Sequence, residues 1–191
     1  MEYQKIRPYI SLSEWRDADT ETILKDLVLC KEKNLSALSV EESAYSLTKS
    51  LATGSKIKIY ALTNNPNIAP PEVTQLFINN KTDLPISSFI ITFTLNRTEH
   101  LDIKEILFES KNTECTGFLL IDEKSKYLHR FYDFLNSLDS KFDGEIHYCA
   151  GTNDIRKIYD AYNLVKKIKP KLLSRLKLFV TNQFDFSAVS I

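Results

Sequence analysis

The sequence contains little glycine, with four residues in a chain of 191, where an average protein has about 7%. Loops that hold phosphate groups usually need glycine, because only glycine lets the backbone come close to the ligand. A phosphate site in this chain would therefore depend on side chains or on the amides of other residues.

Cysteine is also scarce. Cys30, Cys115 and Cys149 are odd in number, lie far apart in the chain and form no CxxC pair. This spacing argues against a disulfide framework and against structural zinc. We therefore expect no metal and no cofactor.

The chain has no excess of charge and no long apolar run. Lys plus Arg and Asp plus Glu number 25 each, so the formal net charge is zero. This balance gives no electrostatic attraction to nucleic acid, which is not an expected partner. No run approaches the roughly 20 apolar residues of a membrane span, and the N-terminus lacks the pattern of a signal peptide. We expect a soluble, cytoplasmic protein with no membrane partner.

The basic residues between Lys166 and Arg175 form the one basic run of the sequence. Lysines near the end of a predicted helix usually complement the helix dipole. Contact with RNA or with an acidic partner is the alternative interpretation.

The segment from Asn34 to Asn67 has the pattern of a strand, a helix and a strand with short connections. Apolar residues in 35–40 and 57–62 predict the strands, and helical spacing over 41–52 predicts a helix that ends before Gly54. Two strands joined through one helix run parallel, so this segment predicts a right-handed βαβ unit.

The same alternation continues over the rest of the chain. Five further strands are predicted at 5–12, 87–95, 117–122, 144–150 and 176–181. Helices are predicted at 20–34, 98–111, 127–138 and 154–169, with a short one at 72–77 after Pro70 and Pro71. We expect a single α/β domain over residues 1–191, built as a small or incomplete (β/α) TIM-type barrel of about seven strand-helix units, or as a partly open relative.

The pattern of residues 34–67 resembles the second and third strand-helix units of the deoxyribose-phosphate aldolase family, whose members are class I aldolase barrels. The segments YISLSEWRDADTETILKDLVLCKEKN and GEIHYCAGTNDI are similar to that family's first unit and to a strand end with a glycine turn. The resemblance covers most of the chain and implies a barrel with about one strand-helix pair fewer than eight.

The resemblance also implies a Schiff-base lysine on a late strand, and here the sequence departs from the family. The best-matching position holds His147, which can transfer protons but cannot form an iminium. Lys124 and Lys126 follow a predicted strand, and Lys177 comes early in its strand, away from the end where barrels place active sites.

The C-terminal ends of the predicted strands supply the candidate site. His147 and Cys149 lie on one face of their strand, and with Asp122 they form the predicted catalytic set for proton transfer or nucleophilic attack. Gly151 and Thr152 form the predicted phosphate-binding turn. In the alternative interpretation Cys149 and His147 are buried core residues. The remaining strand-end candidates are Ser11, Glu14, Glu41, Thr63, Asn64, Thr94, Asn96, Glu123 and Asn182.

Two functions follow from these observations. We expect a degenerate, aldolase-like barrel that has lost catalysis and serves as an interaction or regulatory protein. The alternative is an aldolase-like lyase that acts on a small sugar phosphate or carbonyl compound, with His147 as acid/base. A truncated barrel would leave strand edges or apolar surface to be covered, which predicts a protein partner or a homo-oligomer.

Overall fold

The computed structural model describes residues 2–13, 19–63, 74–78, 89–95, 115–122, 126–150 and 153–189. Its strands are β1 (Ile10–Ser13), β2 (Ala37–Glu41), β3 (Lys58–Thr63), β4 (Thr74–Ile78), β5 (Phe89–Thr94), β6 (Cys115–Asp122), β7 (Glu145–Ala150) and β8 (Leu176–Val180). Its α-helices are α1 (Thr20–Glu32), α2 (Glu42–Leu51), α4 (Leu128–Ser137) and α5 (Ile155–Ile168). Short 3-10 helices are η1 (Tyr3–Tyr9), η3 (Pro170–Arg175) and η4 (Phe186–Val189).

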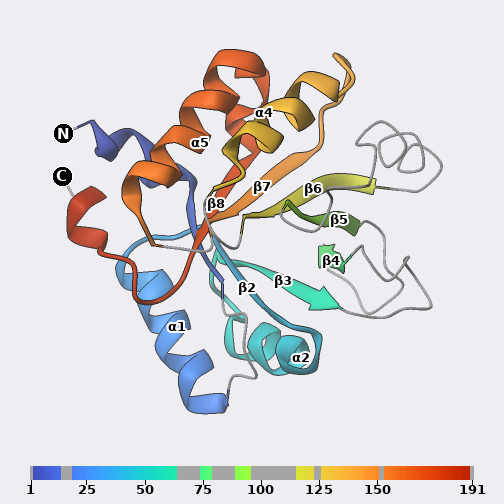
Figure 1. The fold of residues 1–191 in the computed structure, drawn as a ribbon. Helices are drawn as coiled ribbons and strands as arrows, with labels where there is room; N and C mark the ends of the chain where they lie inside the picture. The colour runs from blue at the N-terminus through green and yellow to red at the C-terminus, as the bar shows by residue number, and fades with distance from the viewer. Residues whose placement is uncertain are drawn as a thin grey trace.

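The eight strands close into a barrel in chain order, from β1 to β8 and back to β1. Neighbouring strands are parallel except around β4, which runs antiparallel to both β3 and β5. Seven strands therefore run in one direction and β4 runs in the other. In Figure 1, α1 and α2 lie on the side of β1–β3, and α4 and α5 lie on the side of β7 and β8.

Strand β4 corrects one prediction, since the short helix expected at 72–77 is a strand at Thr74–Ile78. Its backbone bonds on one side to β3 and on the other to β5, the strands that come before and after it in the chain. This antiparallel pairing outweighs a local helix signal that depended mainly on two prolines. With the reversed strand the described sheet has eight strands, one more than the seven that were predicted.

The N-terminal segment corrects a second prediction. The strand expected at 5–12 is a 3-10 helix over Tyr3–Tyr9 followed by a shorter strand, Ile10–Ser13. Pro8 lies inside the helical part. Proline has no backbone N–H to donate to a neighbouring strand, and its fixed φ suits a helical turn. The barrel strand therefore begins only after the proline.

The predicted βαβ unit is confirmed as β2, α2 and β3 with parallel pairing. Gly54 has a φ of 80° in the turn after α2, a conformation that favours glycine. The helices predicted at 127–138 and 154–169 correspond to α4 and α5. The helix predicted at 98–111 lies outside the described residues.

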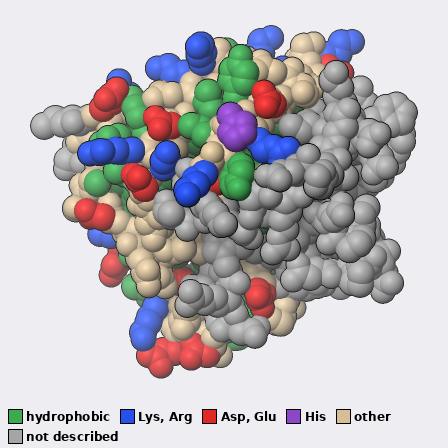
Figure 2. Space-filling view, in the orientation of Figure 1, with side chains coloured by type: hydrophobic (Ala, Val, Ile, Leu, Met, Phe, Trp, Pro, Cys, Tyr) green, Lys and Arg blue, Asp and Glu red, His purple; other side chains and the backbone are tan. Residues whose placement is uncertain are grey.

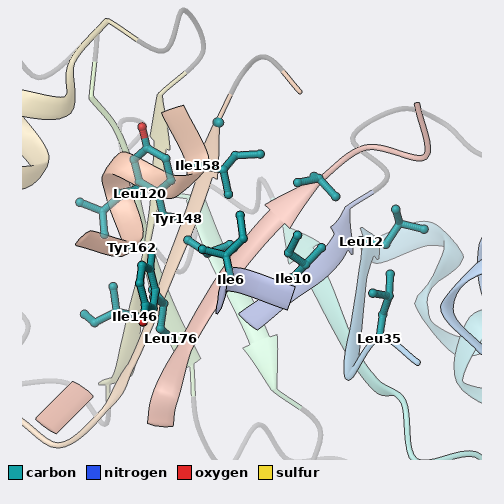
Figure 3. Close-up of a cluster of buried hydrophobic side chains, with 14 of the residues drawn as sticks. Ile6, Ile10, Leu12, Leu35, Leu120, Ile146, Tyr148, Ile158, Tyr162 and Leu176 are labelled. Atoms are coloured by element: carbon teal, nitrogen blue, oxygen red, sulfur yellow. The ribbon is translucent and has the colours of Figure 1, made fainter. Parts of the chain in front are cut away.

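Strand alternation gives the sheet two faces. The outer face carries large apolar residues that pack against the helices, and Figure 3 shows part of this core around Ile6, Ile10, Leu120, Tyr148 and Ile158. The inner face carries a smaller apolar cluster of Ala37, Tyr60, Leu119, Cys149 and Phe179. The polar residues that could form a site lie on the same inner face. Among the described helices, none is both long and apolar enough to span a membrane.

Candidate functional site in the barrel interior

The register of β6 and β7 decides which predicted site residues meet. Leu119 pairs with His147 and Ile121 with Cys149, so these four residues share one face. Leu119 and Cys149 belong to the inner cluster, which places His147 inside the barrel as well. The structure therefore brings His147 and Cys149 to the interior side of one strand, as their two-residue spacing predicts.

Asp122 does not join them. It pairs with Ala150, on the opposite face of the sheet from His147 and Cys149. Its carboxylate is fully buried and accepts hydrogen bonds from the backbone N–H groups of Lys126 and Tyr127, at 3.0 and 2.9 Å. The Tyr148 hydroxyl donates a third bond at 3.1 Å. Asp122 therefore holds the connection between β6 and α4, and the predicted three-residue set does not form.

Glu145, which is not among the candidates predicted from the sequence, is at the centre of the hydrogen-bond network in the barrel interior. Its Oε1 accepts a hydrogen bond from Lys58 Nζ at 2.8 Å, and its Oε2 accepts one from the Tyr60 hydroxyl at 2.9 Å. The Nε2 atom of His147 lies 2.9 Å from the same Oε2. Lys58 and Tyr60 belong to β3, which lies opposite β7 in the closed barrel. One carboxylate thus ties two opposed strands together across the barrel.

The ion pair of Lys58 and Glu145 lies at the N-terminal ends of the strands. Lys58 and Glu145 are the first residues of β3 and β7. Burial by itself raises the pKa of Glu145, but hydrogen bonds and charges of His147 and Lys58 outweigh burial and hold that pKa well below its ordinary value. The carboxylate is therefore a fixed negative charge, stabilised by three donors.

The imidazole of His147 is fully buried. Its ring centroid lies 4.9 Å from that of Tyr60 and 5.2 Å from that of Phe179. Burial lowers the pKa of His147, against the hydrogen bond and charge of Glu145, which raise it. A neutral imidazole has one N–H, and a carboxylate can only accept, so the proton belongs on Nε2. Nδ1 is then a lone-pair acceptor, and no described side chain or backbone group bonds to it.

The described strands carry two lysines, Lys58 and Lys177. Lys177 faces the interior as the register partner of His147, and its Nζ donates to Ser36 Oγ at 2.9 Å. Burial lowers the pKa of Lys177, the nearby Glu145 opposes this change, and Lys58 adds to it. Both amines lie at the N-terminal ends of their strands, the end at which parallel barrels place stabilising residues.

Serines face the interior from β1 and β2. Ser13 pairs with Ser39 and Ser11 pairs with Phe179, so all three hydroxyls lie on the inner face. Ser39 is also the register partner of Tyr60. Each serine is almost completely buried, and its Oγ has no hydrogen-bond partner within the described part of the chain.

The other predicted site residues have varied outcomes. Gly151 and Thr152, the predicted phosphate turn, lie outside the described residues, and so do four strand-end candidates: Glu14, Asn64, Asn96 and Glu123. Asn182 donates to Asp26 at 3.2 Å, beside α1. In the described residues, no group of three or more His, Cys, Asp or Glu side chains is arranged to hold a metal ion.

The fold and the interior define an α/β protein whose curled, mostly parallel sheet is compatible with an incomplete TIM-type barrel. No protein-family model matches the sequence, and no curated protein matches it. Among solved structures, the chain is similar to a "putative deoxyribose-phosphate aldolase from Coccidioides immitis", with a TM-score of 0.38 and 8% identical residues over 95% of this chain and 83% of that chain. A likeness of this size carries no argument about activity, so the function is derived from the residues alone.

Proposed function

We propose that this protein is a degenerate, aldolase-like barrel that works without catalysis, as an interaction or regulatory protein. The observation that supports this proposal is that the polar groups of the interior already bond to one another. Glu145 is already bonded to Lys58, Tyr60 and His147, and His147 is enclosed by aromatic rings. These contacts are those of a structural cluster.

Schiff-base chemistry needs an unprotonated amine at the face where substrate enters. Lys58 is ion-paired with Glu145 at 2.8 Å, so its amine is already engaged. Lys177 donates to Ser36 at the amino end of the barrel. Neither amine lies at the C-terminal strand ends, where substrates of parallel barrels bind.

Borohydride trapping tests the loss of this chemistry. The protein is incubated with glyceraldehyde, ribose or ribose phosphate, reduced, and measured by intact mass. We expect no adduct above the slow, multi-site labelling of surface lysines, and the same result for Lys177→Arg. A single stoichiometric adduct that disappears in Lys177→Arg or in Lys58→Arg would overturn the proposal.

The alternative function, a lyase with His147 as acid/base, is favoured by one observation. Glu145 orients the His147 ring through Nε2, which leaves a basic lone pair on Nδ1, and carboxylate–imidazole pairs of this kind serve general bases. The test is cleavage of hydroxy-carbonyl compounds by the unmodified protein and by His147→Gln. We expect no turnover by either protein, whereas turnover that His147→Gln abolishes would favour the lyase.

For the interaction itself, we propose that the exposed face of α1 contacts a second copy of this chain. Leu24 and Val28 lie one turn apart on α1, with exposed fractions of 44% and 51%. A shallow hollow follows this face from Glu21 to Glu32 and reaches Asn182. Exposed apolar side chains along a groove are typical of a contact surface.

The charges beside this apolar pair support a copy of the same chain as the partner. An antiparallel pair of α1 helices related by a two-fold axis at residue 26 sets Leu24 against Val28 of the partner helix. The same axis sets Glu21 of each helix against Lys31 of the other helix, so the contact contains two pairs of opposite charges. Figure 2 shows acidic and basic side chains interspersed among the described residues on one face of the molecule.

Sedimentation velocity at micromolar concentration tests this contact. We expect a dimer that Val28→Glu dissociates, whereas Leu47→Glu, at an exposed apolar residue of α2, leaves it intact. Glu21→Lys and Lys31→Glu are each expected to weaken the dimer, and the double variant is expected to restore it. A monomer at all concentrations, or a dimer insensitive to Val28→Glu, would contradict the α1 contact.

A further inference from the structure

Four buried polar side-chain atoms of the described residues lack a hydrogen-bond partner: Ser11 Oγ, Ser13 Oγ, Ser39 Oγ and His147 Nδ1. All four belong to residues on the inner face of the barrel. Buried hydroxyls are nearly always bonded, because a group that leaves water without gaining a partner destabilises the fold. A concentration of such atoms in one place indicates a function.

The three serines lie on two adjacent strands. Ser13 and Ser39 are register partners, and Ser11 lies two residues before Ser13 on the same face. The interior position that remains on β2 before Ser39 is Ala37, whose side chain is also small. The interior is therefore lined with small side chains along β1 and β2.

Large side chains reach the interior from other strands. Tyr60, His147 and Phe179 come from β3, β7 and β8 and lie with their ring centroids 4.9 to 6.2 Å apart. The hydroxyl of Tyr60 extends to Glu145, at the N-terminal end of β7. These rings lie beside the small residues of β1 and β2, since Phe179 pairs with Ser11 and Tyr60 pairs with Ser39.

We infer that Ser11, Ser13 and Ser39 form a binding site for a small, uncharged, hydroxylated or carbonyl compound. Hydroxyl groups both donate and accept, so they match alcohols and carbonyls without requiring a charge. The interior cations of the described strands, Lys58 and Lys177, are engaged with Glu145 and Ser36. The next inward position on β2 after Ser39 is Glu41, whose carboxylate disfavours an anion. This site needs neither catalysis nor self-association, so it goes beyond the proposed function.

Calorimetric titration with glycerol, erythritol and dihydroxyacetone tests the inference, with glycerol phosphate as the charged comparison. We expect saturable binding of at least one uncharged probe. Ser13→Ala and Ser39→Ala should each weaken it about three- to tenfold, the range for one lost neutral hydrogen bond. Ser140→Ala, at an exposed serine, is the matched control and should bind as the unmodified protein does.

Thermal unfolding without ligand supplies a second readout. Because the hydroxyls have no described partner, Ser13→Ala and Ser39→Ala should leave Tm unchanged or raise it. A fall in Tm of about 2–4 °C or more would indicate that the hydroxyls already hold stabilising bonds in the free protein, and would overturn the inference. No saturable binding of any uncharged probe, equal binding in all variants, or tighter binding of glycerol phosphate would also overturn it.

Discussion

At the scale of single residues, Glu145 organises the barrel interior. It accepts hydrogen bonds from Lys58, Tyr60 and His147, and so connects β3 with β7. A strand-end rule does not select Glu145, because it begins its strand. The two-residue period that placed His147 and Cys149 on one face also places Glu145 there. Had that period been followed towards the N-terminus, it would have indicated the carboxylate from the sequence alone.

The buried imidazole of His147 predicts a pH dependence of stability. Burial lowers its pKa from the ordinary 6.5, so the folded protein keeps the ring neutral while the unfolded chain takes up a proton. The contribution of the neutral ring to the free energy of unfolding is therefore complete above about pH 6.5 and is lost as the pH falls below it. Uptake of one proton on unfolding limits this slope to about 1.4 kcal/mol per pH unit. Urea unfolding of the unmodified protein and of His147→Gln should show this slope only in the former.

Other charged groups face His147, and they do not reverse this direction. Glu145 raises the pKa of His147, while Lys177 and Lys58 lower it. The pKa of Glu145 is itself lowered from 4.5, so its contribution is lost only at more acidic pH. His129→Gln, at an exposed position of α4, is the control and should keep the slope of the unmodified protein. An unchanged slope in His147→Gln would contradict the prediction.

At the scale of elements, the pairing of β6 with β7 depends on one glycine. A Cβ atom placed on Gly117 would lie 2.5 Å from the backbone oxygen of Glu145. Because that oxygen belongs to the backbone, β7 would have to move. We expect Gly117→Ala to destabilise the fold by about 2–3 kcal/mol in urea unfolding.

Gly54→Ala is the comparison for this substitution. Gly54 has a positive φ, but a Cβ atom there would meet nothing within 4 Å. Its replacement should therefore destabilise by about 1 kcal/mol, for backbone reasons alone. Equal effects of the two substitutions would show that the close approach of β6 and β7 does not add to the destabilisation by Gly117→Ala.

The sequence predicts elements well where the pattern is local. The unit of β2, α2 and β3 follows from apolar spacing and from Gly54. The helix prediction at 72–77 is wrong, because the pairing of β4 with β3 and β5 leaves no signal in the local apolar spacing. The prediction that Asp122 joins His147 is wrong, because strand register depends on long-range contacts. A shift of one residue along a strand moves a side chain to the other face of the sheet.

At the scale of the whole molecule, β4 changes the expectation of an open, truncated barrel. Every strand from β1 to β8 has two neighbours, so the described sheet has no unpaired edge. The described sheet therefore offers no open strand edge for a partner to cover. The interaction proposed above depends instead on the apolar face of α1, where Leu24 and Val28 are exposed.

We infer that the charged network around Glu145 holds β3 and β7 together across the barrel. A double-mutant cycle of Lys58→Met and Glu145→Gln, measured by urea unfolding, tests it most directly. Lys58 is 43% exposed, so solvent screens the ion pair, and we expect a coupling energy of about 1 kcal/mol. Single variants whose effects add to within about 0.3 kcal/mol would contradict the claim, since β3 and β7 would then not be held together through Glu145.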